Sequence, residues 1–169
     1  SELAATLEGD MRTFYSSLHE ILARLISAPN CYIAILDKEN SLLEFPYFSD
    51  SMQEEAKPRP LGLGLTELVL RTGQAELLNP PRVLELAEQG EIDVSVAQTM
   101  LNSANSWLGS PLVVDGEIAG VIAVQTYGRH AKYTSKDQEL LRLVSPPKPD
   151  TKERKHKTTT KTHSHTTPR

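Results

Sequence analysis

Cys31 is the only cysteine in the 169-residue chain, and its thiolate would be the strongest nucleophile that the sequence offers. A single cysteine forms neither an internal disulfide nor a zinc site built from cysteines. Cys31 opens the short apolar segment 31–36, where a thiol packs as a small hydrophobic group. The sequence therefore predicts a buried structural thiol. We expect no catalytic residue in this chain and no enzymatic activity.

Histidine is the usual ligand for a metal ion or a haem, and the chain has five histidines. We expect His19 to face solvent on a helix and His130 to lie in a polar loop. The other three are near the C-terminus, where the spacing of His163 and His165 is only weakly indicative of a metal site. The prediction is therefore that there is no metal site, and the sequence names no cofactor.

Gly62 and Gly64 form a glycine-rich turn that invites comparison with phosphate-binding loops. The turn lacks the lysine of a phosphate-binding loop and the third glycine of a dinucleotide-binding fingerprint. It is better explained as a tight turn into a short helix that Thr66 caps.

Polar side chains beside apolar segments are the better candidates for a ligand site. Gln125 and Tyr127 are two residues apart, so both point to one face of a strand, and such a pair can edge a pocket. Thr66, Ser110 and the only tryptophan, Trp107, complete the candidate set. For Gln125 and Tyr127, the alternative is that both simply emerge into solvent where the strand ends. For Trp107, the alternative is that it is a core anchor, either as well as or instead of a pocket wall.

The elements that position these residues include a hairpin, with strands at 106–114 and 117–127 joined by Asp115 and Gly116. An Asp-Gly pair between apolar runs is the strongest short-range hairpin signal, because both residues tolerate a positive φ. The second run has no polar residue from 118 to 124, so both faces of this strand should be buried. The sheet must therefore be covered on both sides.

Similar signals predict the remaining elements. Strands are expected at 31–36, 42–48 and 75–78, with Pro46 marking an edge position or a bulge. Helices are expected at 3–27, 67–71 and 80–89, after Asp93, and from Thr134, which forms a capping pair with Asp137. The resulting fold class is α+β, with an antiparallel sheet of about six strands. The terminal helices cover one face, and the helical crossover 66–104 covers the other.

The predicted N-terminal helix carries apolar residues at alternating steps of four and three. This stripe consists of Leu7, Met11, Phe14, Leu18, Ile21 and Leu25. The same spacing is typical of a coiled-coil seam. The stripe can pack on the domain's own sheet or pair with a second copy, and the two are compatible. Leu7, Met11, Phe14 and Leu18 are the predicted dimerisation residues of a homodimer.

Composition separates residues 1–145, predicted to be one domain, from residues 146–169. The second segment has seven Lys or Arg against two Asp or Glu, and none of the large apolar residues, so we expect it to be disordered. Its charge of +5 leaves −9 on the domain, given the total of −4. An acidic domain is a poor nucleic-acid binder. Two interpretations of the segment stay open: a genuine basic tail, or a stretch foreign to the fold, through a reading-frame slip, a truncation or an artificial addition. The second is favoured.

Four segments together resemble the GAF domains of bacterial signalling proteins. They are 61–66 (LGLGLT), 69–74 (VLRTGQ), 106–125 (SWLGSPLVVDGEIAGVIAVQ) and 133–141 (YTSKDQELL), and the likeness extends over about residues 15–145. Such domains are found ahead of diguanylate cyclase, phosphodiesterase or histidine kinase modules. The resemblance implies a PAS-like, six-stranded sheet with strand order 2-1-5-4-3-6 or close to it. It also implies a small-molecule pocket between the sheet and the central helices, and dimerisation through the terminal helices.

The function that this resemblance implies is a sensory module that binds an unidentified small molecule, signals through its terminal helices and acts on a downstream output module. The alternative is a dimerisation scaffold without a ligand. Free methionine-R-sulfoxide reductases share the fold but need several cysteines. Residues 66–105 contain neither the cysteine nor the histidine of a bilin attachment site, and the signature of cyclic-nucleotide GAF domains cannot be placed. With no signal segment and no membrane-spanning run in the sequence, a cytoplasmic location away from membranes is expected.

Overall fold

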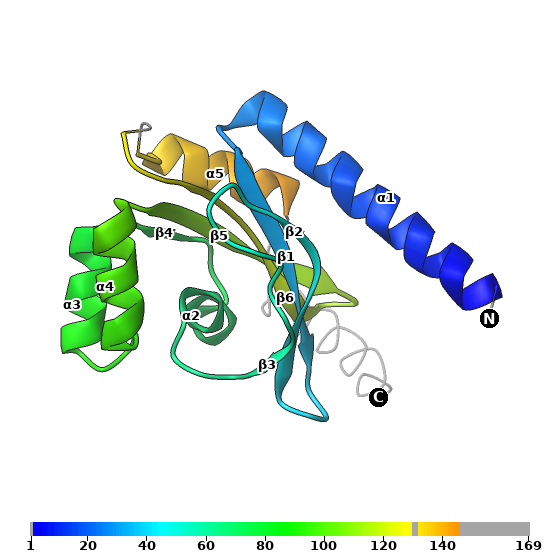
Figure 1. The fold of residues 1–169 in the computed structure, drawn as a ribbon, viewed down its shortest axis with the longest axis horizontal. Coiled ribbons are helices and arrows are strands. Elements are labelled where there is room, and N and C mark those ends of the chain that lie inside the picture. The colour runs from blue at the N-terminus through cyan, green and yellow to red at the C-terminus, as the bar shows by residue number, and fades with distance from the viewer. Residues whose placement is uncertain (1, 130–131, 146–169) are drawn as a thin grey trace, which may run out of the picture.

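The computed structural model of the chain describes residues 2–129 and 132–145, without the side chains of residues 4, 7 and 8. His130 and the segment 146–169 lie outside the described residues. The elements are α1 (Glu2–Leu25), β1 (Asn30–Asp37), β2 (Leu42–Ser49), β3 (Arg59–Pro60), α2 (Leu65–Thr72), β4 (Glu76–Leu78), α3 (Pro80–Glu88), α4 (Val94–Ser103), β5 (Ser106–Val114), β6 (Glu117–Thr126) and α5 (Ser135–Val144). Figure 1 shows their arrangement.

The six strands form one antiparallel sheet in the order β3-β2-β1-β6-β5-β4. Without the two-residue β3, the other five strands follow the order 2-1-5-4-3 that the resemblance implied. The sixth strand was expected beyond β4. The structure describes no strand there; its additional strand, β3, lies beside β2 at the opposite edge, so that part of the expected order is wrong. Arg59 and Pro60 escaped prediction because two residues show no alternation.

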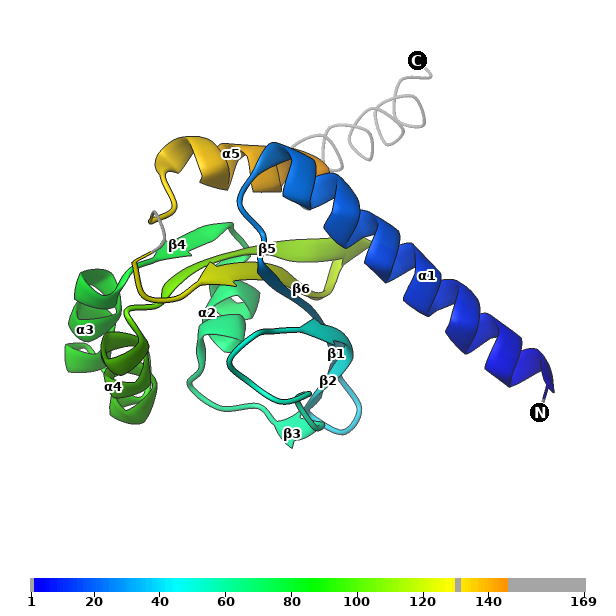
Figure 2. The same ribbon diagram turned by 45° about the horizontal axis from the view of Figure 1, so that its top comes forward.

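Helices cover both faces of this sheet, as the apolar β6 requires. On one face, α1 and α5 pack against residues such as Ile33, Leu108 and Ile122. On the other, α2, α3 and α4 pack against a core that includes Tyr32, Trp107 and Val121. Figures 1 and 2 show the terminal helices on one side and the central helices on the other. The predicted α+β class and its two covers are confirmed.

The apolar stripe of α1 does not face the sheet as a whole. Leu22 and Ile26 are 0% and 5% exposed and Leu18 packs partly on the same core, so the buried positions follow steps of four. Met11 and Phe14 are 47% and 57% exposed. There are two physical reasons. The N-terminal half of α1 projects beyond the domain (Figure 2), and in the C-terminal half the helix turns Leu22 and Ile26 to the sheet, which leaves Ile21 and Leu25 47% and 49% exposed.

Local signals in the sequence predicted the turns and caps well. Asp115 and Gly116 have φ of 50° and 78°, as a two-residue hairpin turn requires. Thr134 and Asp137 form a reciprocal capping box at the start of α5. The β1–β2 register shifts between Ile33 and Ile35, so the strand that holds Pro46 carries the predicted bulge.

His19 corrects one expectation, because it does not face solvent. Its Nε2 lies 2.7 Å from the carbonyl oxygen of Ala28, and its Nδ1 lies 2.7 Å from the hydroxyl of Tyr47. A carbonyl only accepts, so Nε2 carries the proton. The imidazole therefore joins α1 to the sheet.

Candidate functional site

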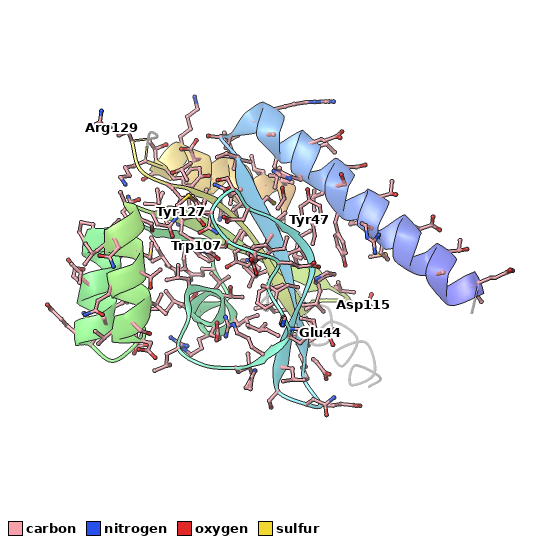
Figure 3. All side chains as sticks on the ribbon, in the orientation of Figure 1. Glu44, Tyr47, Trp107, Asp115, Tyr127 and Arg129 are labelled. Carbon is pink, nitrogen blue, oxygen red and sulfur yellow. The ribbon has the colours of Figure 1, made fainter. Side chains whose placement is uncertain are left out.

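A cavity of about 300 Å³ lies between the sheet and the helices α2 and α4, on the face away from α1 and α5. Tyr32 of β1, Trp107 of β5 and Gln125 of β6 form its floor. Trp107 and Gln125 are directly paired across β5 and β6, which places both side chains on one face. Figure 3 labels Trp107 on the α4 side of the sheet and Tyr47 on the side of α1.

Aromatic rings make one wall of this cavity. The ring of Phe48 stacks on that of Tyr32 with centroids 5.5 Å apart, and Phe45 meets Tyr32 edge-on at 5.8 Å. Phe45 and Phe48 are three residues apart, so a regular strand would turn them to opposite faces. The bulge at Pro46 adds a residue to β2 and brings both rings to the same side.

A chain of hydrogen bonds crosses the cavity floor. The indole Nε1 of Trp107 donates to the hydroxyl of Tyr32 at 3.2 Å, and that oxygen lies 2.7 Å from Oγ1 of Thr66. Only one proton can lie between the two hydroxyl oxygens. The other hydroxyl proton has no acceptor among the described residues, so the pair can donate to a bound molecule. Burial raises the pKa of Tyr32 to about 12, so the phenol stays neutral at physiological pH.

Thr66 has a different local role from the one predicted. Gly64 is the N-cap of α2, and Thr66 lies inside the first turn with its hydroxyl turned to Tyr32. A Cβ on Gly64 would lie 2.8 Å from Oε1 of Glu67 and 3.3 Å from Nη2 of Arg59, so any other residue would displace these two side chains. The prediction of a Thr66 cap is wrong because the buried hydroxyl serves the cavity floor instead of the helix end.

Arg59 and Glu67 form a two-pronged ion pair at the cavity rim, with nitrogen–oxygen distances of 2.6 and 3.0 Å. The Glu67 side chain is only 4% exposed, and the backbone N–H of Gly62 donates to it at 2.8 Å. Burial alone would raise the pKa of Glu67, but the hydrogen bonds from Arg59 and Gly62 bring it below its usual value. The Glu67 carboxylate therefore pairs with both terminal nitrogens of Arg59, and the two opposite charges at the cavity rim largely cancel.

Asp50 ties a loop to the sheet beside the cavity. Its Oδ2 accepts from the side chains of Gln125 and Tyr127, each at 2.8 Å. Its Oδ1 accepts from the backbone N–H groups of Met52 and Gln53. Gln53 lines the cavity, so Asp50 fixes one part of its rim.

The predicted site residues separate into three groups. Thr66, Trp107 and Gln125 line the cavity; Trp107 is also a core residue at 1% exposure. Tyr127 does not line the cavity. Its hydroxyl and the side chain of Gln125 both donate to Asp50, so the two residues of the predicted polar pair are joined through this carboxylate. Ser110 lines a different cavity and lies three residues after Trp107, so strand alternation turns it to the other face. Ser110 is therefore not part of this site.

Sequence reasoning missed Tyr32, Arg59, Glu67 and Asp50. Glu67 had a recognisable signal, because a carboxylate between the apolar residues of a short amphipathic helix needs a partner when it is buried. The other three depend on long-range packing. Cys31 is 1% exposed, and burial raises the pKa of its thiol to about 12, so the expected buried thiol is confirmed. Residues 2–129 and 132–145 contain no group of three or more His, Cys, Asp or Glu placed to hold a metal ion.

The family profile described as GAF domain matches residues 8–146. The chain belongs to the GAF family. The search of curated proteins found no match. No helix among the described residues is long and apolar enough to cross a membrane.

Solved structures share the GAF fold at low sequence identity. A GAF domain/HD domain protein from Geobacter sulfurreducens is 14% identical, with 80% of this chain and 87% of that chain covered and a TM-score of 0.60. The GAF domain of a sensor histidine kinase from Bacillus halodurans is 13% identical, with 78% and 85% covered and a TM-score of 0.55. A free methionine-R-sulfoxide reductase of Staphylococcus aureus is 18% identical, with 85% and 87% covered and a TM-score of 0.56. These likenesses establish the fold.

Proposed function

We propose that this GAF domain is a regulatory module of bacterial signal transduction that binds a small molecule in the cavity between the sheet and the helices α2 and α4. The observation that carries the proposal is this cavity of about 300 Å³, with its aromatic wall and the spare hydroxyl proton of the Tyr32–Thr66 pair. Apolar walls with a few fixed polar groups are typical of small-molecule sites. The solved GAF domain of a sensor histidine kinase supports a signalling context.

The central strand β1 offers a physical route from the cavity to the terminal helices. Tyr32 belongs to the core that faces α2 and α4, whereas its neighbours Cys31 and Ile33 belong to the core that faces α1 and α5. A ligand that contacts Tyr32 therefore bears on a strand that packs against both terminal helices. Filling the cavity shifts the packing of these helices only to the extent that the ligand prefers one arrangement over another.

Binding is favoured over catalysis by the state of Cys31. A buried thiol with a pKa of about 12 is not a nucleophile at physiological pH. The reductases with this fold were expected to need several cysteines, and this chain has one. A cytoplasmic location agrees with a single reduced thiol.

A homodimer through α1, with an output module beyond the domain, completes the proposal. Met11 and Phe14 are half exposed on the projecting half of the helix, whereas Leu18 already packs partly on the core. Leu7 is on the same helix, but its side chain is outside the described part. Met11→Glu should therefore shift analytical ultracentrifugation toward monomer, while the control Met52→Glu, on an exposed loop residue, should leave the distribution unchanged. An equal effect of both changes, or none of Met11→Glu, would contradict this interface.

The ligand hypothesis is tested by native mass spectrometry of the purified chain together with thermal shifts across nucleotides, amino acids and organic acids. We expect a co-purified molecule or a compound that raises the melting temperature. Thr66→Val should weaken its binding by about tenfold, because a buried hydrogen bond to the ligand is lost. The control Thr72→Val, exposed on the same helix, should bind normally.

The second candidate function is a dimerisation scaffold without a ligand, which the exposed apolar face of α1 favours. A dimer that carries no small molecule and shows no thermal shift with any compound would support the scaffold and overturn the sensor.

A further inference from the structure

A second cavity, of about 400 Å³, lies at the seam between α5 and the edge strand β4. Its lining includes the segment 73–75 that leads into β4, Ser110 of β5, and Gln138, Glu139 and Arg142 of α5. β4 pairs only with residues 107–109 of β5. From Ser110 onward, β5 therefore has no β4 residue beside it. Figures 1 and 2 both show α5 beside β4 at this edge of the sheet.

Ser110 is the feature of this cavity that calls for a ligand. Its side chain is fully buried, yet among the described residues its hydroxyl has no hydrogen-bond partner. Ser106, on the same strand and equally buried, donates to Asn79 at 2.6 Å and accepts from the N–H of Tyr133 at 3.1 Å. Because an unpaired buried hydroxyl is unfavourable, an occupant that bonds to Ser110 would be stabilised there.

The same cavity carries one positive and one negative side chain. Arg142 and Glu139 form an ion pair on α5 and are about half exposed. One nitrogen of the Arg142 guanidinium takes part in this pair, and the group has further N–H donors. Gln138 donates through Nε2 to the carbonyl oxygen of Ala75 at 2.8 Å, and its Oε1 is a hydrogen-bond acceptor. The lining thus offers donors for a carboxylate and acceptors for an ammonium group.

We propose that this cavity binds a small zwitterion that carries a carboxylate and an ammonium group, the chemistry of a free amino acid. The carboxylate accepts from the hydroxyl of Ser110 and from Arg142. The ammonium group donates to Glu139 and to Oε1 of Gln138. A molecule with a carboxylate alone makes no bond to Glu139 and Gln138, and a molecule with an ammonium group alone makes none to Ser110 and Arg142.

The site would act directly on α5. The Gln138–Ala75 hydrogen bond already joins this helix to the residue before β4. Ser145, the C-cap of α5, donates to the carbonyl oxygen of Pro111 in β5 at 2.7 Å. A zwitterion between Ser110 and Arg142 adds a further tie between the sheet and the helix. This input is separate from the cavity beneath α2 and α4, since the two cavities share no lining residue and lie on opposite faces of the sheet.

The test is a titration of the full chain, labelled with ¹⁵N, with three compounds of similar size: L-alanine, propionate and propylamine. We expect L-alanine to shift the amide signals of residues 73–75, 110 and 138–142 at the lowest concentration, and the two singly charged compounds to bind about tenfold more weakly. No shift with L-alanine would overturn the proposal and leave water as the occupant. Shifts confined to residues 64–66 and 105–107 would overturn it too, because they would place L-alanine in the cavity beneath α2 and α4.

Variants separate the contacts. Ser110→Ala should weaken L-alanine binding by about tenfold while leaving the melting temperature of the free protein unchanged or higher, because it removes an unpaired hydroxyl. The matched change Ser106→Ala should lower the melting temperature, because Asn79 and the N–H of Tyr133 lose a partner. If Ser110→Ala bound L-alanine as the native chain does, the hydroxyl would have no part in binding and the proposal would fail.

The roles of the Glu139 and Arg142 charges are tested by comparing how each variant binds L-alanine, propionate and propylamine. Glu139→Gln should weaken the binding of L-alanine and propylamine but not that of propionate. Arg142→Gln should weaken the binding of L-alanine and propionate but not that of propylamine. Equal losses for all three compounds in both variants would show a merely structural role for the ion pair and would contradict the proposed arrangement.

Discussion

The two faces of the sheet are held by different kinds of contact. On the α2–α4 face, Trp107, Tyr32 and Thr66 form a buried hydrogen-bond chain beside the Arg59–Glu67 ion pair. On the face of the terminal helices, an apolar core is accompanied by separate polar ties. They come from the side chains of His19, Tyr133, Gln138 and Ser145, and most of them end on a backbone carbonyl oxygen. Polar networks fix geometry, whereas apolar contacts are not directional. The linked network of the first face therefore suits recognition, whereas on the second face each terminal helix is joined to the sheet by ties that are not linked to one another.

The largest expected effect tests the apolar face. Leu22→Ala removes a fully buried side chain that packs α1 on the sheet, and should lower the free energy of unfolding by about 3 kcal/mol. The matched change Leu25→Ala, at 49% exposure on the same helix, should stay within about 0.5 kcal/mol in a monomer. Urea unfolding followed by circular dichroism measures both. Equal losses of unfolding free energy in the two variants would contradict the packing of Leu22, and not Leu25, against the sheet.

The next effect tests the polar face. Arg59→Ala leaves the Glu67 carboxylate buried with backbone N–H groups but without its counter-charge, and should cost about 2–3 kcal/mol. The control Arg71→Ala breaks a pair whose side chains are 38% and 51% exposed, together with an exposed hydrogen bond to the carbonyl oxygen of Glu91, and should cost at most about 1 kcal/mol. A loss no larger than the control's would show that the buried pair contributes little.

The same pair makes a prediction about pH. The hydrogen bonds from Arg59 and Gly62 hold the pKa of Glu67 below its unfolded value of 4.5, so their stabilisation is present above pH 4.5 and is lost as the pH falls through the folded pKa. The difference in unfolding free energy between the native chain and Arg59→Ala should therefore shrink in acid. A difference that stays constant from neutral pH to acid would contradict this origin.

A smaller effect tests how much the hydrogen-bond chain on the cavity floor contributes to stability. Tyr32→Phe leaves the indole N–H of Trp107 and the hydroxyl of Thr66 without their shared partner, and should cost about 1–2 kcal/mol. Tyr15→Phe, on half-buried Tyr15 of α1, should cost less than about 0.5 kcal/mol. Similar values for the two variants would mean that the chain does not stabilise the cavity floor.

The sequence was most informative where a signal is local. Asp115–Gly116, Thr134 with Asp137, and the uninterrupted apolar run of β6 each specified their own conformation. Pro46 indicated the bulge, but not that it would bring Phe45 and Phe48 together against Tyr32.

The candidate site was only partly predictable, for physical reasons. Trp107 and Gln125 stood out because a large aromatic and a polar residue border apolar strands. Ser110 could have been assigned to the other face, since it is three positions from Trp107 on one strand. Arg59 and Asp50 could not have been found, because their partners Glu67 and Gln125 are brought to them only by tertiary packing.

Filling the cavity beneath α2 and α4 should change the packing of the terminal helices. Hydrogen–deuterium exchange, with and without the compound that raises the melting temperature most, tests it directly. We expect altered protection around Tyr32 and Thr66 and, across the sheet, in α5 and the C-terminal half of α1. Changes confined to the cavity walls would show that the ligand binds without moving the terminal helices, and would contradict signalling through them.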